Sequence, residues 1–110
     1  MIEINKISNQ SLRNVRDLRM HPAIGYLNYV IYISINNDDL TLYNNKGVNY
    51  DFFLAAASME FDILDFKLCC LNSIECAEIS EDIKEKYKIK FEDEWRLFCE
   101  DVILSLSDLK

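Results

Sequence analysis

The chain has 110 residues, of which 50% are hydrophobic, and this supplies one core but not two, so we predict a single domain over 1–110. A formal net charge of −7 disfavours direct binding to nucleic acid or to anionic membrane surfaces. Residues 1–5 lack the basic start of a secretory signal, and no apolar run approaches the roughly 20 residues of a membrane span. We therefore expect a cytoplasmic protein.

The first elements are predicted from residues 1–20. Alternation of Ile2 and Ile4 predicts a short strand within residues 1–7. Ser8 or Asn9 is expected to cap a helix that runs to about Met20. Three apolar residues repeat every three positions along this helix: Leu12, Val15 and Leu18. His21-Pro22 ends it, because the residue before a proline avoids the helical region.

The middle of the chain predicts an antiparallel hairpin over about 27–44. Residues 26–35 are aromatic and β-branched, which favours a strand. Residues 36–39 have turn chemistry, and 40–43 alternate in polarity like a second strand. Apolar periodicity leaves a buried helix over 22–35 as the alternative.

Helices are expected beyond Asp51. Residues 51–71 predict one helix, or two with a break near Ser58. Ser80 is expected to cap a helix to about Lys88, although residues 86–91 also alternate like an exposed strand. An apolar stripe from Phe91 to Leu106 predicts a last helix. The predicted fold class is α+β, a small antiparallel hairpin or sheet packed against about four helices.

Several chemistries lack their usual residues. Two isolated glycines cannot form a phosphate cradle, and one histidine with four cysteines at unsuitable spacings does not predict a zinc site. Residues 36–39 resemble a calcium loop only loosely. We therefore predict no cofactor, no metal site, no catalytic residue and no enzyme activity, with the cysteines as reduced thiols. Arg13, Arg16 and Arg19 are interpreted as a solvated helix face, with phosphate or an acidic partner as the alternative.

Acidic residues gather in the second half of the chain, around Tyr87. Carboxylates beside an exposed aromatic can dock a cationic protein surface, although a plain solvated helix face is the alternative. The predicted partner-binding residues are Glu75, Glu78, Glu81, Asp82, Glu85, Tyr87, Glu92, Asp93 and Glu94.

Taken together, these features predict a small acidic binding protein. The most concrete hypothesis is a bacterial immunity-type inhibitor that neutralises a basic toxin, such as a nuclease domain, by tight protein–protein binding. The free protein is expected to be a monomer or a weak homodimer. Two alternatives are a phage-type anti-defence or nucleic-acid-mimic protein and a non-catalytic subunit that self-associates.

Overall fold

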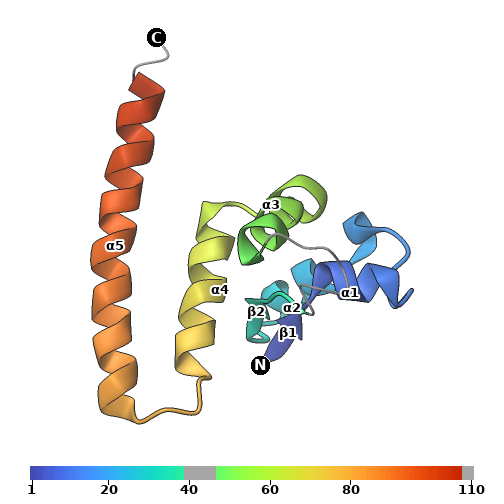
Figure 1. The fold of residues 1–110 in the computed structure, drawn as a ribbon, viewed down its shortest axis with the longest axis horizontal. Coiled ribbons are helices and arrows are strands. Elements are labelled where there is room, and N and C mark those ends of the chain that lie inside the picture. The colour runs from blue at the N-terminus through green and yellow to red at the C-terminus, as the bar shows by residue number, and fades with distance from the viewer. Residues whose placement is uncertain (39–46, 108–110) are drawn as a thin grey trace. The chain divides into compact units, whose positions relative to one another are not determined.

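A computed structural model of the chain describes residues 1–38 and 47–107. The chain divides into two compact units, Met1–Cys76 and Ala77–Lys110. The elements in chain order are β1 (Ile2–Ile4), α1 (Lys6–Ser11), the 3-10 helix η1 (Leu18–Met20), α2 (Ala23–Asn28), β2 (Ile33–Ile35), α3 (Val48–Met59), α4 (Ile63–Glu75) and α5 (Glu81–Ser107). The described chain is thus mostly helical (Figure 1).

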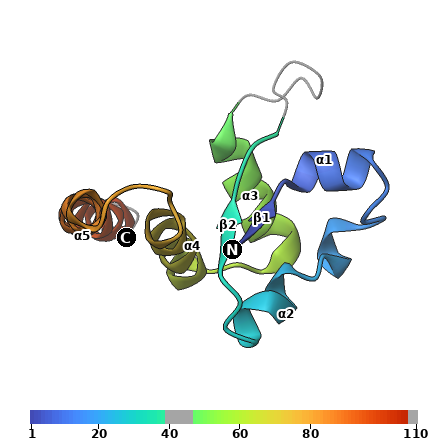
Figure 2. The same ribbon diagram turned by 90° about the horizontal axis from the view of Figure 1, so that it is seen from below.

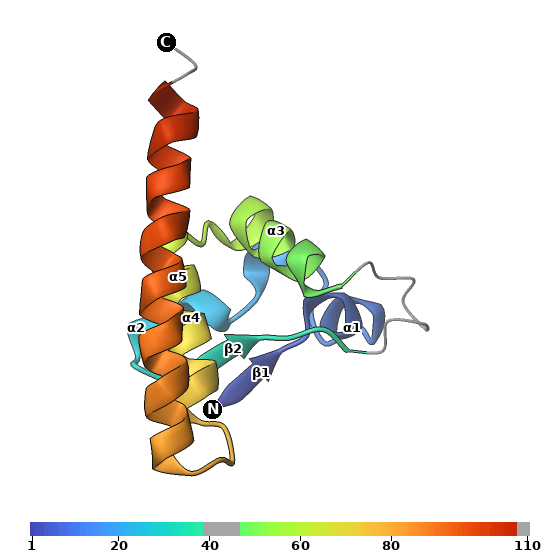
Figure 3. The same cartoon turned by 60° about the vertical axis from the view of Figure 1, so that its left-hand side comes forward.

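The two strands form a parallel pair. Ile2 is opposite Ile33, and Ile4 is opposite Ile35. Figure 3 shows both strands running in the same direction, with α1 at the end where they finish. Parallel strands need a long crossover connection, which is usually helical. Here α1, η1 and α2 supply it.

The predicted antiparallel hairpin is therefore wrong. Residues 26–28 belong to α2, because Pro22 stands immediately before a helix, where its fixed φ and missing N–H are tolerated. The later part, Ile33–Ile35, is buried along its whole length, which is typical of a parallel strand covered on both faces. A helix over all of 22–35 is also wrong, and the predicted strand 40–43 lies outside the described residues.

The core of the first unit lies around β2. Figure 2 shows α4 beside β2, with α1 and α3 on the other side of the strands. Asn72 of α4 donates from Nδ2 to the carbonyl of Ile33 at 3.2 Å, so the helix also satisfies a strand group. The buried apolar residues come from both strands, α2, α3, α4 and the α3–α4 junction: Ile4, Ala23, Ile33, Ile35, Ala55, Met59, Phe61 and Cys69.

Two helices, α3 and α4, cover the region 51–71, for which the sequence predicts one helix or two with a break near Ser58. The break falls at residues 60–62, where Glu60 adopts a left-handed φ of 57°. Asp62 then caps α4: its carboxylate accepts from the N–H groups of Leu64 and Asp65, and Asp65 accepts from the Asp62 N–H. This reciprocal capping box starts α4 firmly and explains a break just beyond Ser58.

The predicted helix to Met20 is wrong, because α1 ends at Ser11. The N–H of Arg13 bonds the carbonyl of Gln10 at 3.0 Å, and the N–H of Asn14 bonds that of Asn9 at 2.9 Å. This pair of bonds is the Schellman motif, and it places Arg13 at the position where glycine is usual. Arg13 has φ 60° there. The local bonds therefore stop the helix despite the continuing apolar repeat.

The second unit contains α5, a continuous helix over Glu81–Ser107, which leaves neither a break at Lys88 nor a strand at 86–91. Three pairs spaced three or four residues apart join along it: Glu81 with Lys84, Lys90 with Glu94, and Arg96 with Glu100. None of its residues, all of which the structure describes, is buried.

Across 1–38 and 47–107, no helix is both long and apolar enough to cross a membrane.

Candidate functional site at the carboxyl ends of the strands

The carboxyl ends of β1 and β2 bring polar residues to one edge of the first unit. Asn5 directly follows β1, and Asn36, Asn37 and Asp38 directly follow β2. The N–H of Asn36 bonds the carbonyl of Ile4 at 3.1 Å, which continues the pairing past the strands and holds these segments together. In parallel sheets, ligands bind outside the carboxyl ends of the strands. This edge is therefore the candidate functional site.

A buried charge pair supports the edge from α1 and α3. Lys6 is completely buried, and Asp51 is 1% exposed. Lys6 Nζ donates to the backbone carbonyl of Asp51, and the Asp51 carboxylate attracts the ammonium group. Burial lowers the pKa of Lys6 from 10.5 to about 8, and Asp51 opposes that shift by favouring the charged form. Lys6 therefore remains mostly charged at pH 7 and compensates a buried carboxylate.

The pair also holds the segment that follows β2. Asn37 donates from Nδ2 to Asp51 Oδ2 at 3.0 Å, and Asn36 donates from Nδ2 to Ser34 Oγ at 2.8 Å. These bonds hold the segment after β2 to the end of that strand and to α3. Asp38, the next residue, is exposed. The arrangement presents an accessible carboxylate on an anchored segment.

Asn5 contributes a hydrogen-bond acceptor at the same edge. Its Oδ1 atom is buried and accepts no hydrogen bond from any of the residues that the structure describes. A buried polar atom without a partner costs about 1–3 kcal/mol, so such atoms are rare in folded proteins. A donor from outside the described residues would satisfy this oxygen.

Further titratable groups surround Lys6. His21 is buried, and its Nδ1 accepts from the Ala23 N–H at 3.2 Å, which assigns the proton to Nε2, 3.3 Å from Asn9 Oδ1. Burial, and then the Lys6 charge, lower the pKa of His21. Burial raises the pKa of the Cys69 thiol to about 12. Both groups are therefore neutral near pH 7, which leaves Lys6 and Asp51 as the charged pair.

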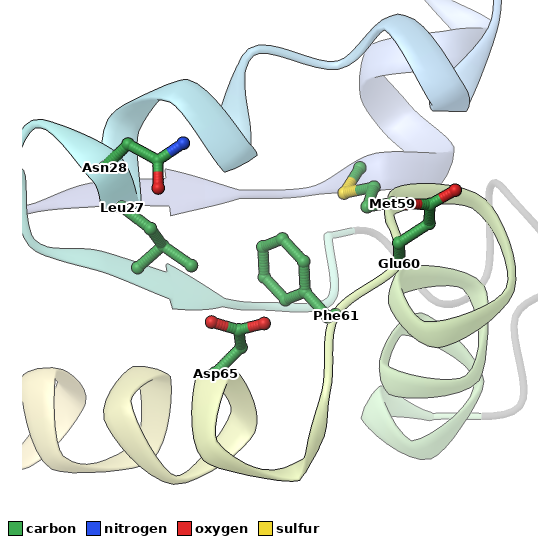
Figure 4. Close-up of a pocket in the computed structure, with 6 residues that line it drawn as sticks. All are labelled: Leu27, Asn28, Met59, Glu60, Phe61 and Asp65. Carbon is green, nitrogen blue, oxygen red and sulfur yellow. The ribbon is translucent and has the colours of Figure 1, made fainter.

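A hollow of about 190 Å³ lies at the α3–α4 junction (Figure 4). In Figure 4 the side chains of Leu27, Phe61 and Asp65 point into the same space. Asp65 is already bound within the capping box of α4, and most of the other lining groups are apolar. The hollow is accounted for by the helix junction, so we do not assign it a site.

The predicted acidic residues lie along α5 and the segment before it. Glu75 ends α4, and Glu78 is exposed between the helices. Glu81, Glu85 and Glu92 are spaced by four and seven residues on α5 and share one face. The remaining predicted residues are also exposed and lie on other lines of the same helix: Asp82, Tyr87, Asp93 and Glu94. Their use by a basic partner, like the cytoplasmic location, stays a prediction.

Sequence reasoning missed the carboxyl-edge residues. Lys6 and Asp51 are 45 positions apart, so no local pattern in the sequence shows that they meet. The polar run 36–38 after an apolar strand is a usable signal for this edge, but the same residue types also predict a hairpin turn. Among residues 1–38 and 47–107, no group of three or more His, Cys, Asp or Glu is arranged to hold a metal ion. All four cysteines are free thiols.

The chain is similar to adenosine deaminases over most of its length. It is 33% identical to adenosine deaminase 2 of Homo sapiens over 104 residues, which cover 92% of this chain and 20% of that protein. Adenosine deaminase 2 of Dictyostelium discoideum is 40% identical over 66% of this chain, and adenosine deaminase of Aedes albopictus is 34% identical over 86%. No protein-family model matches the chain. The chain spans between 13% and 20% of the length of these curated relatives.

These similarities correct the functional hypothesis. Relatives named as deaminases, from animals and from Dictyostelium discoideum, contradict a bacterial immunity-type inhibitor of a toxin and its alternatives. They also contradict the prediction of no enzyme activity. The error arose because acidic charge and missing short motifs were interpreted as positive evidence for an inhibitor. The resemblance is instead distributed over about a hundred residues.

Proposed function

We propose that this chain forms part of an adenosine deaminase and contributes the carboxyl ends of β1 and β2 to the region that holds adenosine. The observation that carries the proposal is the 33% identity over 92% of the chain to adenosine deaminase 2 of Homo sapiens. In the deamination of an adenine ring, water attacks C6 and the exocyclic amino group leaves as ammonia. The chemistry requires groups that accept and return protons beside the ring.

The carboxyl edge offers groups of the required type. The Asp38 carboxylate is exposed and follows an anchored segment, so it can accept a proton or a hydrogen bond from a substrate. Asn5 Oδ1 can accept a hydrogen bond from a donor outside the described residues. Lys6 and Asp51 are positioning residues, because they hold Asn37 and touch no exposed surface.

A chimera tests the proposal directly. The matched 104-residue segment of adenosine deaminase 2 of Homo sapiens is replaced by this chain, and release of ammonia from adenosine is measured. We expect activity well above that of the buffer and of the relative lacking the segment. A folded chimera, with a cooperative thermal transition but no ammonia release, would contradict the proposal.

The role of the carboxyl edge is tested within the chimera. Asp38→Asn should lower kcat about 100-fold or more, the usual loss when a proton-transferring group is removed. Asp82→Asn, which removes an exposed carboxylate on α5, is the matched control and should leave kcat unchanged. Equal activity of both variants would remove Asp38 from the site while leaving the deaminase assignment standing.

A further inference from the structure

We propose that Arg13 and Arg16, at the end of α1, form a binding site for a small organic phosphate monoester. This site lies in the first unit and does not depend on the proposed deaminase function. A hollow of about 490 Å³ is lined there by Gln10, Arg13, Val15 and Arg16. Its size falls within the roughly 300–1,000 Å³ of small-molecule sites.

The two arginines differ from their neighbours in having no counter-charge. Both are exposed, and the side chain of neither makes a hydrogen bond or ion pair with any residue in the described parts of the chain. Arg19, by contrast, donates from Nε and Nη2 to the Asp17 carboxylate, and these bonds lower the pKa of Asp17 to about 2. In a chain of net charge −7, two uncompensated arginines in one hollow are unusual.

The backbone of Arg13 adopts a conformation that is usually occupied by glycine. Arg13 occupies the position of the Schellman motif that favours glycine, with φ 60°. A side chain in this region costs of order 1 kcal/mol, and such strain is concentrated at functional sites. Glycine would end α1 equally well. An arginine at this position is therefore less favourable for stability than glycine would be.

The side chains that line the hollow indicate which class of ligand it binds. Guanidinium groups bind phosphate oxygens through two parallel hydrogen bonds, and two of them match the double negative charge of a phosphate monoester. Gln10 adds an amide and Val15 an apolar wall, which together suit an organic group attached to the phosphate. A long polyanion is disfavoured, because the net charge of the chain repels it.

The test is calorimetric titration of the full chain with ribose 5-phosphate, ribose and inorganic phosphate, in phosphate-free buffer at constant ionic strength. We expect saturable binding of ribose 5-phosphate, weaker binding of inorganic phosphate and none of ribose. Arg13→Gly and Arg16→Gln should each weaken ribose 5-phosphate binding at least about tenfold, the loss typical of one charged hydrogen-bond partner.

A matched control separates binding from stability. Val30 occupies the same position of a second Schellman motif, with φ 58°, after α2. Val30→Gly should relieve similar strain and leave phosphate binding unchanged. Arg13→Gly should remain folded, so lost binding cannot be ascribed to unfolding. Equal binding of ribose and ribose 5-phosphate, equal binding of the ester and inorganic phosphate, or undiminished binding by Arg13→Gly would each overturn the proposal.

Discussion

Charged residues have different surroundings in the two units of the molecule. In Met1–Cys76, Lys6 and Asp51 are buried together and hold the segments after both strands. In α5, pairs such as Arg96 with Glu100 remain exposed and join residues one turn apart. Water and salt screen the exposed pairs much more strongly than the buried pair. The same residue types therefore determine tertiary structure in one unit and only local helix geometry in the other.

The largest effect should follow from breaking the buried pair. Asp51→Ala leaves the Lys6 ammonium buried without its carboxylate, and we expect a loss of about 3–5 kcal/mol in the free energy of unfolding. Urea denaturation followed by circular dichroism measures this change. A loss below about 1 kcal/mol would mean that water reaches Lys6 and that the two units do not differ in screening.

Alkaline pH should raise the free energy of unfolding of the first unit, because of Lys6. Its pKa is lowered from 10.5 to about 8 on folding, so the unfolded chain binds more protons between these values. Stability should therefore rise from pH 8 to pH 10.5, by about 3 kcal/mol for this group. Cys69, with its raised pKa, acts in the opposite direction above pH 9. The comparison of the wild-type chain with Lys6→Met in urea, at each pH, isolates the lysine contribution.

Backbone strain also differs between the two units. The non-glycine residues with positive φ in the described chain all belong to the first unit: Arg13, Val30 and Glu60. Val30 is β-branched and 81% exposed, so little packing offsets its strain. Val30→Gly should raise the free energy of unfolding by about 1 kcal/mol. Thermal unfolding would show a higher Tm, whereas a lower Tm would indicate that the exposed side chain contributes contacts.

The smallest effect is expected on α5. Arg96→Ala removes the exposed pair with Glu100 and should cost less than about 0.5 kcal/mol, because solvent screens the charges. High salt should remove most of that difference. The helical circular dichroism signal at increasing urea concentration provides the measurement. A loss comparable to that of Asp51→Ala would show that the exposed and buried pairs are energetically equivalent.

Local signals were sufficient for part of the fold. The alternation of Ile2 and Ile4 predicts β1, the alternative of a break near Ser58 agrees with the separation of α3 from α4, and the stripe from Phe91 lies within α5. Each of these features depends on residues a few positions apart. The parallel pairing of β1 with β2 depends on residues about 30 positions apart, and no local pattern encodes it.

The candidate site was harder to predict than the fold. From the sequence alone, Asp38 cannot be distinguished from an ordinary turn residue. Its place at a candidate site becomes clear only when the strand before it is known to be parallel. Lys6 is completely buried, and no pattern near the start of the chain predicts this. Arg13 was interpreted as one of a helical row because the apolar repeat continues past Ser11, where the Schellman motif ends the helix.

The parallel pairing of the strands has a consequence for the order of folding. The contacts of β1 with β2 close a loop over residues 5–32 before any ladder bond can form. Helix formation in α5 requires only local contacts and is complete within about a microsecond. Non-local parallel pairing is intrinsically slower. We therefore expect helical signal to appear in an early kinetic phase and burial of Lys6 to report a later one.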